Sequence, residues 1–147
     1  MSERRRPVGL PIMAWERDGL VAALARAGLS TKDVKSSGPL FWRFESDDSP
    51  VGFGGLEIHG DAALLRSVVT LPPLRRRGFG RGIVEVLELE ARLRGGRTVW
   101  LLASEPGFFE RLGYRPCPRE ALPQALRETA EVSGAPASAV AMTKPLA

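Results

Sequence analysis

The stretch SVVTLPPLRRRGFGRG, residues 67–82, decides the fold. An apolar run ends at Thr70, two prolines stop it, and three arginines at positions 75–77 lead into Gly78 and Gly80. Glycine has no Cβ, so an anion can approach its backbone closely. The first N–H groups of a helix have no partner within the helix and attract negative charge. The stretch therefore predicts a strand, then a loop that binds an anion, then the start of a helix.

Two familiar phosphate-binding motifs do not fit this loop. The P-loop requires Gly-Lys-Ser/Thr after its glycines, and this chain has Arg81 and Gly82 there. The dinucleotide fingerprint requires Gly-x-Gly-x-x-Gly directly after a strand, whereas these glycines lie at 78, 80 and 82, behind a loop. Two readings stay open: an anion site of another kind, or a solvated basic loop whose glycines only make a tight turn.

Apolar periodicity and turn residues on both sides of this stretch indicate a single α/β (α+β) domain over residues 1–147. Helices are expected at 18–27, 78–94, 106–112 and 121–127, with a further short helix after a turn at 29–34. Strands are expected at 39–44, 51–59, 62–70, 98–102 and 139–143. Residues 1–8 and 131–138 are expected to be loosely structured, and the first of these segments to be flexible.

A two-residue link, Gly60 and Asp61, predicts a β-hairpin and fixes its register. In that register Glu57 and Arg66 lie diagonally on one face of the hairpin, within reach of each other. The apolar residues expected to share the opposite face are Leu56, Ile58, Leu65 and Val69. Two interpretations of the polar pair stay open. Either Glu57 accepts a proton from a substrate while Arg66 binds a carboxylate or oxyanion of that substrate, or the two form a structural ion pair.

Charge and composition exclude several classes of protein. The net charge is +4 and the isoelectric point about 10.0, but Arg81 and the arginines at 75–77 together carry as much charge as the net excess. A local anion site therefore explains the basic balance better than nucleic-acid binding, which needs a broad basic face. No apolar run approaches the ~18 residues of a membrane span, and no secretory signal is recognisable. We expect a cytoplasmic protein with neither a nucleic acid nor a membrane as partner. One histidine, His59, and one cysteine, Cys117, are too few for a His/Cys metal site, so no metal is expected.

Two motifs resemble those of the GNAT superfamily of acetyl-CoA-dependent N-acetyltransferases. Arg75, Gly78 and Gly80 match its pyrophosphate motif, Arg/Gln-x-x-Gly-x-Gly/Ala, and FFERLGY at 108–114 is similar to its second signature, aromatic-aromatic-Glu-x-Leu-Gly-aromatic. The motifs occur in the family's order, and the resemblance covers roughly residues 12–144. It implies a GNAT fold, with a central mixed, mostly antiparallel sheet flanked by helices on both faces.

The resemblance also implies acetyl-CoA as co-substrate and a small-molecule amine as acceptor. It places the pantetheine arm against the backbone of Val68, Val69 and Thr70, with amide groups near Val68 and Val69 polarising the thioester. The residues it places around the pyrophosphate are Arg75, Arg76, Arg77, Gly78, Phe79, Gly80 and Arg81. It further allows a homodimer, because the last strands of this superfamily often support dimers.

One departure from the family concerns the general acid. Many members carry a tyrosine at the second aromatic position of the second signature, where this chain has Phe109. The acid for the leaving thiolate is then Ser104, Tyr114 or water, or there is none. An alternative function follows, namely a CoA-binding sensor or assembly module with weak or no catalysis.

A closer resemblance concerns three stretches, residues 27–33, 54–68 and 136–142. They are similar to the small acetyltransferases found with arsenic-resistance genes. This resemblance implies that the acceptor is an amino-acid-like arsenical or a related toxin.

Overall fold

A seven-stranded mixed sheet forms the centre of the structure, a computed structural model that describes residues 6–74 and 78–146. The strand order is β1-β2-β3-β4-β5-β7-β6, and neighbours are antiparallel except β4 and β5, which are parallel. The strands are β1 (Val8–Pro11), β2 (Leu40–Ser46), β3 (Ser49–His59), β4 (Ala62–Thr70), β5 (Thr98–Ala103), β6 (Arg115–Pro116) and β7 (Val140–Pro145). The expected mixed, mostly antiparallel sheet is confirmed.

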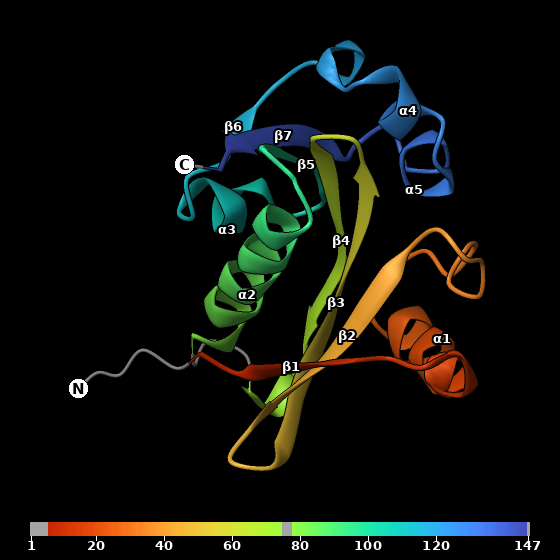
Figure 1. Cartoon of the computed structure of the whole chain (residues 1–147), viewed down its shortest axis with the longest axis vertical. Coiled ribbons are helices and arrows are strands. Elements are labelled where there is room, and N and C mark those ends of the chain that lie inside the picture. The colour runs from red at the N-terminus through yellow and green to blue at the C-terminus, as the bar shows by residue number, and fades with distance from the viewer. Residues whose placement is uncertain (1–5, 75–77, 147) are drawn as a thin grey trace.

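Helices cover both faces of this sheet, as expected. They are α1 (Arg17–Arg26), α2 (Phe79–Leu93), α3 (Pro106–Glu110), α4 (Gln124–Arg127) and α5 (Ala130–Ser133), with 3-10 turns η1 (Ala14–Glu16), η2 (Pro72–Leu74) and η3 (Arg119–Ala121). Figure 1 shows the sheet nearly edge-on, with α2 and α3 on one side and α1, α4 and α5 on the other. In the part of the chain that the structure describes, no helix is long and apolar enough to cross a membrane.

The long helix α2 forms because one of its faces is apolar. Phe79, Ile83 and Leu87 are buried in a core that they share with Leu56 and Leu65 of the hairpin. Each fully buried side chain of this kind contributes about 1.5–3 kcal/mol. On the opposite face of the sheet, α1 packs on β2 and β4, and α4 and α5 pack on β4, β5 and β7. The sheet is thus buried on both faces.

The predicted hairpin register is confirmed as far as Arg66. Glu57 pairs with Leu64, and Gly55 pairs with Arg66. The next pair is Phe53 with Val69, so β4 contains one residue more than β3 at this point, a β-bulge. The bulge reverses the alternation of side chains, and Val69 packs on the α1 side of the sheet. The prediction that Val69 shares a face with Leu56, Ile58 and Leu65 is therefore wrong.

Other differences lie in short elements. The short helix expected after residue 29 is absent, since residues 32–35 form hydrogen-bonded turns in a segment rich in Ser, Thr and Asp, which compete for helix hydrogen bonds. The strands β1 and β6 were not predicted, and β1 begins at Val8, within the segment expected to be flexible. Within 131–138, expected to be loose, α5 forms because the hydroxyl of Thr129 caps it.

Candidate functional site

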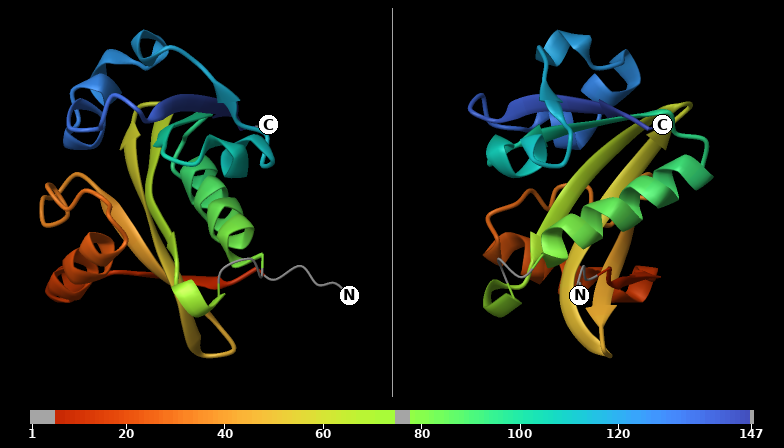
Figure 2. Two further views of the ribbon diagram at one scale, coloured as in Figure 1. Left: turned by 180° about the vertical axis from the view of Figure 1, so that it is seen from behind. Right: turned by 90° about the vertical axis from the view of Figure 1, so that its left-hand side faces the viewer.

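The centre of the candidate site is the point where β4 and β5 part. The two strands pair only over residues 62–64 of β4 and 98–100 of β5. Beyond these pairs β4 continues to Thr70, paired with β3 on its other side. Figures 1 and 2 show β5 and β7 running crosswise to β3 and β4. One edge of β4 therefore leaves the sheet ladder within the domain, where an extended ligand can pair with it as a strand would.

Ser67 occupies the bulge that follows this point. Its φ is +60°, in the left-handed region that such bulges usually give to glycine. For a residue with a Cβ this conformation costs roughly 1–2 kcal/mol. The hydroxyl of Ser67 accepts a hydrogen bond from Nε of Arg66 at 3.1 Å. The strained residue is therefore tied to its neighbour's side chain.

The start of α2 lies against the end of β4. Gly78 is the N-cap of α2 with a φ of 84°, so the position favours glycine. A Cβ on Gly80 would lie 3.1 Å from the ring of Phe108 and 3.3 Å from Oγ1 of Thr70. The helix start, the strand end and α3 thus meet around Gly80. The start of a helix and the dipole of α2 favour an anion here.

The structure brings together most of the residues expected to bind the co-substrate. Val68, Val69 and Thr70 form the end of β4, Phe79 is buried beneath the first turn of α2, and Arg81 is exposed on it. Arg81 forms an ion pair with Glu85 at 3.3 Å. Three expected residues, Arg75, Arg76 and Arg77, lie outside the described residues.

A buried ionic cluster lies on the α1 side of β3 and β4. The guanidinium of Arg66, whose side chain has no exposed surface, donates to Asp33 at 2.7 Å and to Glu57 at 3.1 Å. Its Nη2 lies 3.5 Å from a carboxylate oxygen of Glu131, and its Cζ lies 5.3 Å from the centre of the Phe41 ring. Glu57 and Arg66 thus meet as the register predicted, but three carboxylates share the one guanidinium.

The electrostatics of the cluster follow from burial and charge. Burial alone would lower the pKa of Arg66, but the hydrogen bond to Asp33 and the three carboxylates raise it above its ordinary value. Burial raises the pKa of Glu131, Arg66 lowers it, and the charges of Asp33 and Glu57 raise it. Burial is the largest of these effects, so the pKa of Glu131 lies above its ordinary value even with Arg66 beside it.

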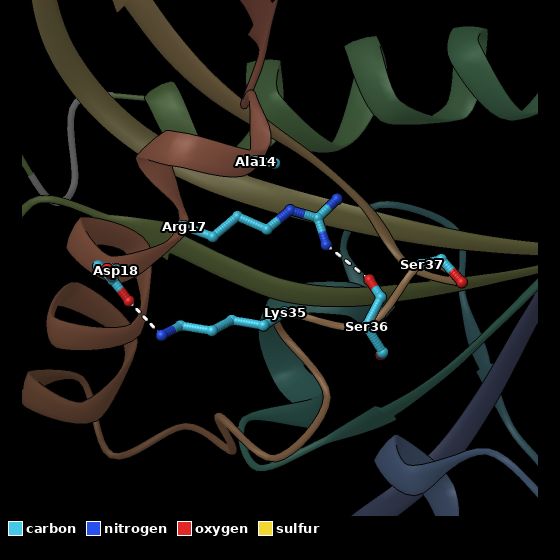
Figure 3. Close-up of a pocket in the computed structure, with 6 residues that line it drawn as sticks. All are labelled: Ala14, Arg17, Asp18, Lys35, Ser36 and Ser37. Carbon is cyan, nitrogen blue, oxygen red and sulfur yellow. Dashed lines mark hydrogen bonds and ion pairs between the residues drawn. The ribbon is translucent and has the colours of Figure 1, made fainter.

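The loop at 33–39 covers the cluster from the α1 side. Arg17 donates to the carbonyl oxygens of Val34 and Ser36, both at 2.7 Å, and to that of Pro39 at 3.2 Å. Figure 3 shows Arg17 reaching this loop across a pocket of about 390 Å³, with Lys35 paired to Asp18 at its other side. A Cβ on Gly38 would lie 4.0 Å from a carboxylate oxygen of Glu57. The loop is therefore part of the wall around Glu57.

Tyr114, a candidate general acid, lies elsewhere in the core. Its hydroxyl donates to Glu88 of α2 at 2.8 Å, and Lys144 pairs with the same carboxylate at 3.0 Å. Burial, followed by the charge of Glu88 and the hydrogen bond to it, raises the pKa of Tyr114 well above its ordinary value. A phenol that is held in this way is a poor proton donor. The geometry favours a structural role for Tyr114.

Three residues of the site were missed by the sequence analysis: Asp33, Ser67 and Glu131. Asp33 lies in a turn and Glu131 in a segment expected to be loose, and both reach Arg66 only through the fold. No local pattern marks such long-range partners. Ser67 also carries no local signal, since serine rarely adopts a positive φ within a strand.

Comparison with known families and proteins gives consistent results. Residues 37–116 match the sequence model of the acetyltransferase (GNAT) domain. An uncharacterised N-acetyltransferase of Chlorobaculum tepidum is 36% identical over 64 residues, which are 44% of this chain and 41% of that protein. The chain thus matches about two fifths of the length of this relative.

Several solved structures have the same fold. N-acetylglutamate synthase of Neisseria gonorrhoeae, in complex with coenzyme A and N-acetyl-glutamate, aligns with 99% of this chain and 36% of its own, at 14% identity and a TM-score of 0.77. The protein Rv2747 of Mycobacterium tuberculosis, in complex with CoA and NLQ, aligns with 96% of this chain and 100% of its own, at 21% identity and a TM-score of 0.76. At these identities the likeness shows a shared fold.

Proposed function

Because the chain belongs to the GNAT acetyltransferase family, we propose that it transfers the acetyl group of acetyl-CoA to the amine of a small molecule. One observation carries the proposal: β4 runs on without β5 after Leu64, and its end at Thr70 lies against the start of α2, so an extended ligand edge leads to an anion site. The pantetheine arm of acetyl-CoA pairs with the backbone of Val68, Val69 and Thr70. The pyrophosphate binds the first turn of α2 at Gly78 and Gly80, with the side chain of Arg81 beside it.

The proposed reaction is direct attack of the amine on the thioester. The amine nitrogen forms a bond to the carbonyl carbon, the bond from that carbon to sulfur breaks, and CoA leaves as a thiolate. Backbone N–H groups at Val68 and Val69 stabilise the negative charge on the carbonyl oxygen. The amine loses a proton, and the thiolate takes one from water.

Glu57 is the proposed acceptor of the amine's proton, reached through water. One of its oxygens is bound to Arg66 at 3.1 Å, and the other lies 3.6 Å from Nε2 of His59. The side chain of Glu57 is buried, and that of its neighbour His59 is 38% exposed and contacts solvent. The geometry supports a role for Arg66 in holding Glu57 better than it supports direct binding of a substrate carboxylate, because the carboxylates of the cluster already surround the guanidinium.

The proposed acceptor is an amino acid or an amino-acid-like arsenical. The stretches that resemble the acetyltransferases of arsenic resistance support an arsenical. The shared fold with N-acetylglutamate synthase supports an amino acid. A cytoplasmic site of action fits both substrates.

A thiol-release assay with acetyl-CoA and a panel of amino acids, arsenicals and polyamines tests the function. We expect turnover with at least one α-amino acid or amino-acid-like arsenical, and none with the polyamines. Calorimetric titration with acetyl-CoA runs in parallel. Binding of acetyl-CoA without turnover on any amine would instead support a sensor or assembly module, the second candidate, which the absence of a tyrosine at Phe109 favours.

We expect Glu57→Gln to lower kcat about a hundredfold at pH 7.5, because a positioned general base contributes roughly 10²–10⁴-fold. The amide keeps the size of the side chain and an oxygen that accepts from Arg66. Steady-state thiol release over a range of pH is the measurement. A near-normal kcat at every pH would eliminate Glu57 as the base.

We expect Tyr114→Phe to keep kcat within about threefold of the unsubstituted protein, whereas loss of a general acid would cost about 10²–10⁴-fold. The substitution removes one hydrogen bond to Glu88, which keeps its ion pair with Lys144. We therefore expect the free energy of unfolding to fall by about 1–2 kcal/mol. Denaturant titration and thiol release measure the two effects, and a selective loss of kcat would restore Tyr114 as the acid.

A further inference from the structure

Ser67 has a conformation that its position in the chain does not explain. In the described part of the chain, Asp47, Asp48 and Ser67 are the residues other than glycine with a positive φ. The two aspartates lie in the tight turn between β2 and β3, where this conformation is common. Ser67 lies within a strand and is only 9% exposed. Glycine would adopt the same backbone without strain. The feature that glycine would lack is the hydroxyl and its hydrogen bond to Arg66.

The donor to that hydroxyl is held rigidly. Asp33 and Glu57 bind Nη1 of Arg66, Glu131 faces Nη2, and the side chain is completely buried. These contacts leave Nε pointing at Oγ of Ser67, at 3.1 Å. The hydrogen bond therefore connects the bulge to a fixed point of the α1-side cluster.

The bulge needs such a connection because the sheet constrains it weakly. A bulge disrupts the ladder with the neighbouring strand, here between the pairs Gly55–Arg66 and Phe53–Val69. On the other side of β4, the pairing with β5 has already ended at Leu64. The backbone at 67–68 thus has fewer paired residues in the neighbouring strands than the parts of β4 before and after it.

We propose that Ser67 is a positioning residue: its hydrogen bond to Arg66 fixes the bulge in the shape that points the backbone N–H groups at Val68 and Val69 toward the thioester carbonyl. This inference rests on the proposed function. Through Arg66 the same contact links the groups that polarise the thioester to Glu57. Arg66 then positions both the proposed proton acceptor and the groups that polarise the thioester, although it contacts neither substrate.

The test compares Ser67→Gly with Ser67→Asn. Glycine accepts the left-handed backbone but offers no hydroxyl to hold the bulge. We expect kcat to fall roughly tenfold, because a small displacement of groups that act on the reacting atoms costs this much or more. The affinity for CoA should not change. Asparagine tolerates the same backbone and offers a carbonyl oxygen to Nε of Arg66. We expect Ser67→Asn to recover most of the lost kcat. Asp48→Gly is the matched control: it relieves the same strain in an exposed turn, and kcat should not change.

Infrared spectroscopy gives a readout that does not depend on the acceptor. Acetyl-CoA labelled at the thioester carbonyl, bound to the full chain, should show a carbonyl stretch at lower frequency than in water, because hydrogen bonds weaken the C=O bond. In Ser67→Gly we expect the frequency to return part of the way to that in water. A frequency and a kcat equal to those of the unsubstituted protein would overturn the role of Ser67 and leave the proposed function intact. Failure of the unsubstituted protein to bind acetyl-CoA would overturn both.

Discussion

Gly80→Glu is expected to raise the dissociation constant for acetyl-CoA roughly a thousandfold. The added carboxylate would stand in the first turn of α2, where the pyrophosphate of acetyl-CoA is proposed to bind, and like charges that are brought together cost several kcal/mol. A loss of about 4 kcal/mol corresponds to a thousandfold change in affinity. Calorimetric titration of acetyl-CoA into the purified variant measures the effect.

The same substitution should spare the helix itself. Glutamate has a far better helix propensity than glycine, and an acidic residue in the first turn interacts favourably with the helix dipole. The local cost is steric, because the new Cβ would lie 3.1 Å from the ring of Phe108. Gly80→Ala isolates this cost, since it adds the Cβ without the charge, and we expect it to weaken binding by about tenfold or less.

Gly19→Glu is the matched control for added charge. It introduces the same side chain into α1, where a Cβ on Gly19 meets no atom within 4 Å. We expect its affinity for acetyl-CoA to equal that of the unsubstituted protein. Its melting temperature should be equal or higher, because glutamate replaces glycine within a helix. If Gly80→Glu binds acetyl-CoA within a few-fold of that control, the start of α2 is not the pyrophosphate site.

The sequence predicts those parts of the fold whose cause is local. The apolar face of α2 and the two-residue turn at Gly60 and Asp61 each act within a few residues. The helix is confirmed, and so is the hairpin register as far as Arg66. The edge strands β1 and β6 are short, and the sheet alone makes them strands. Their sequences carry too little alternation to predict them.

The candidate site also combines local features, which the sequence predicts, with tertiary features, which it does not. The loop and helix start are local features, so Gly78 and Gly80 could be placed from the motif alone. The neighbours of Arg66 could not, because Asp33 and Glu131 come from segments 33 and 65 residues away along the chain. The bulge at Ser67 is a tertiary feature as well, and it changed the face predicted for Val69.

Arg66→Met should lower the free energy of unfolding by about 3–5 kcal/mol at neutral pH, the usual cost of removing one partner from a buried ion pair. Methionine matches the apolar part of the arginine side chain but leaves Asp33, Glu57 and Glu131 without a cation. Arg43→Met is the matched control, since Arg43 pairs with Glu16 at 2.6 Å while its side chain is 37% exposed. We expect that control to lose less than about 1 kcal/mol.

The loss in Arg66→Met should depend on pH with a definite sign. Burial already raises the pKa of Glu131, and Arg66 is the one group that lowers it, so its removal raises that pKa further. The folded state then binds more protons than the unfolded state between the ordinary pKa of a glutamate and the raised one. Stability must therefore fall as pH rises through this window and partly recover as pH falls toward 5.

Adding Glu131→Gln to Arg66→Met separates charge from packing. The amide removes one of the three carboxylates around this position, so the double variant should be more stable than Arg66→Met at pH 8, by a margin that shrinks toward pH 5. Urea titrations of both variants at several pH values measure this difference. If Arg66→Met is equally stable at pH 5 and pH 8, the arginine acts through packing alone. Its proposed role as the cation that holds Glu57 and orients Ser67 would then be wrong.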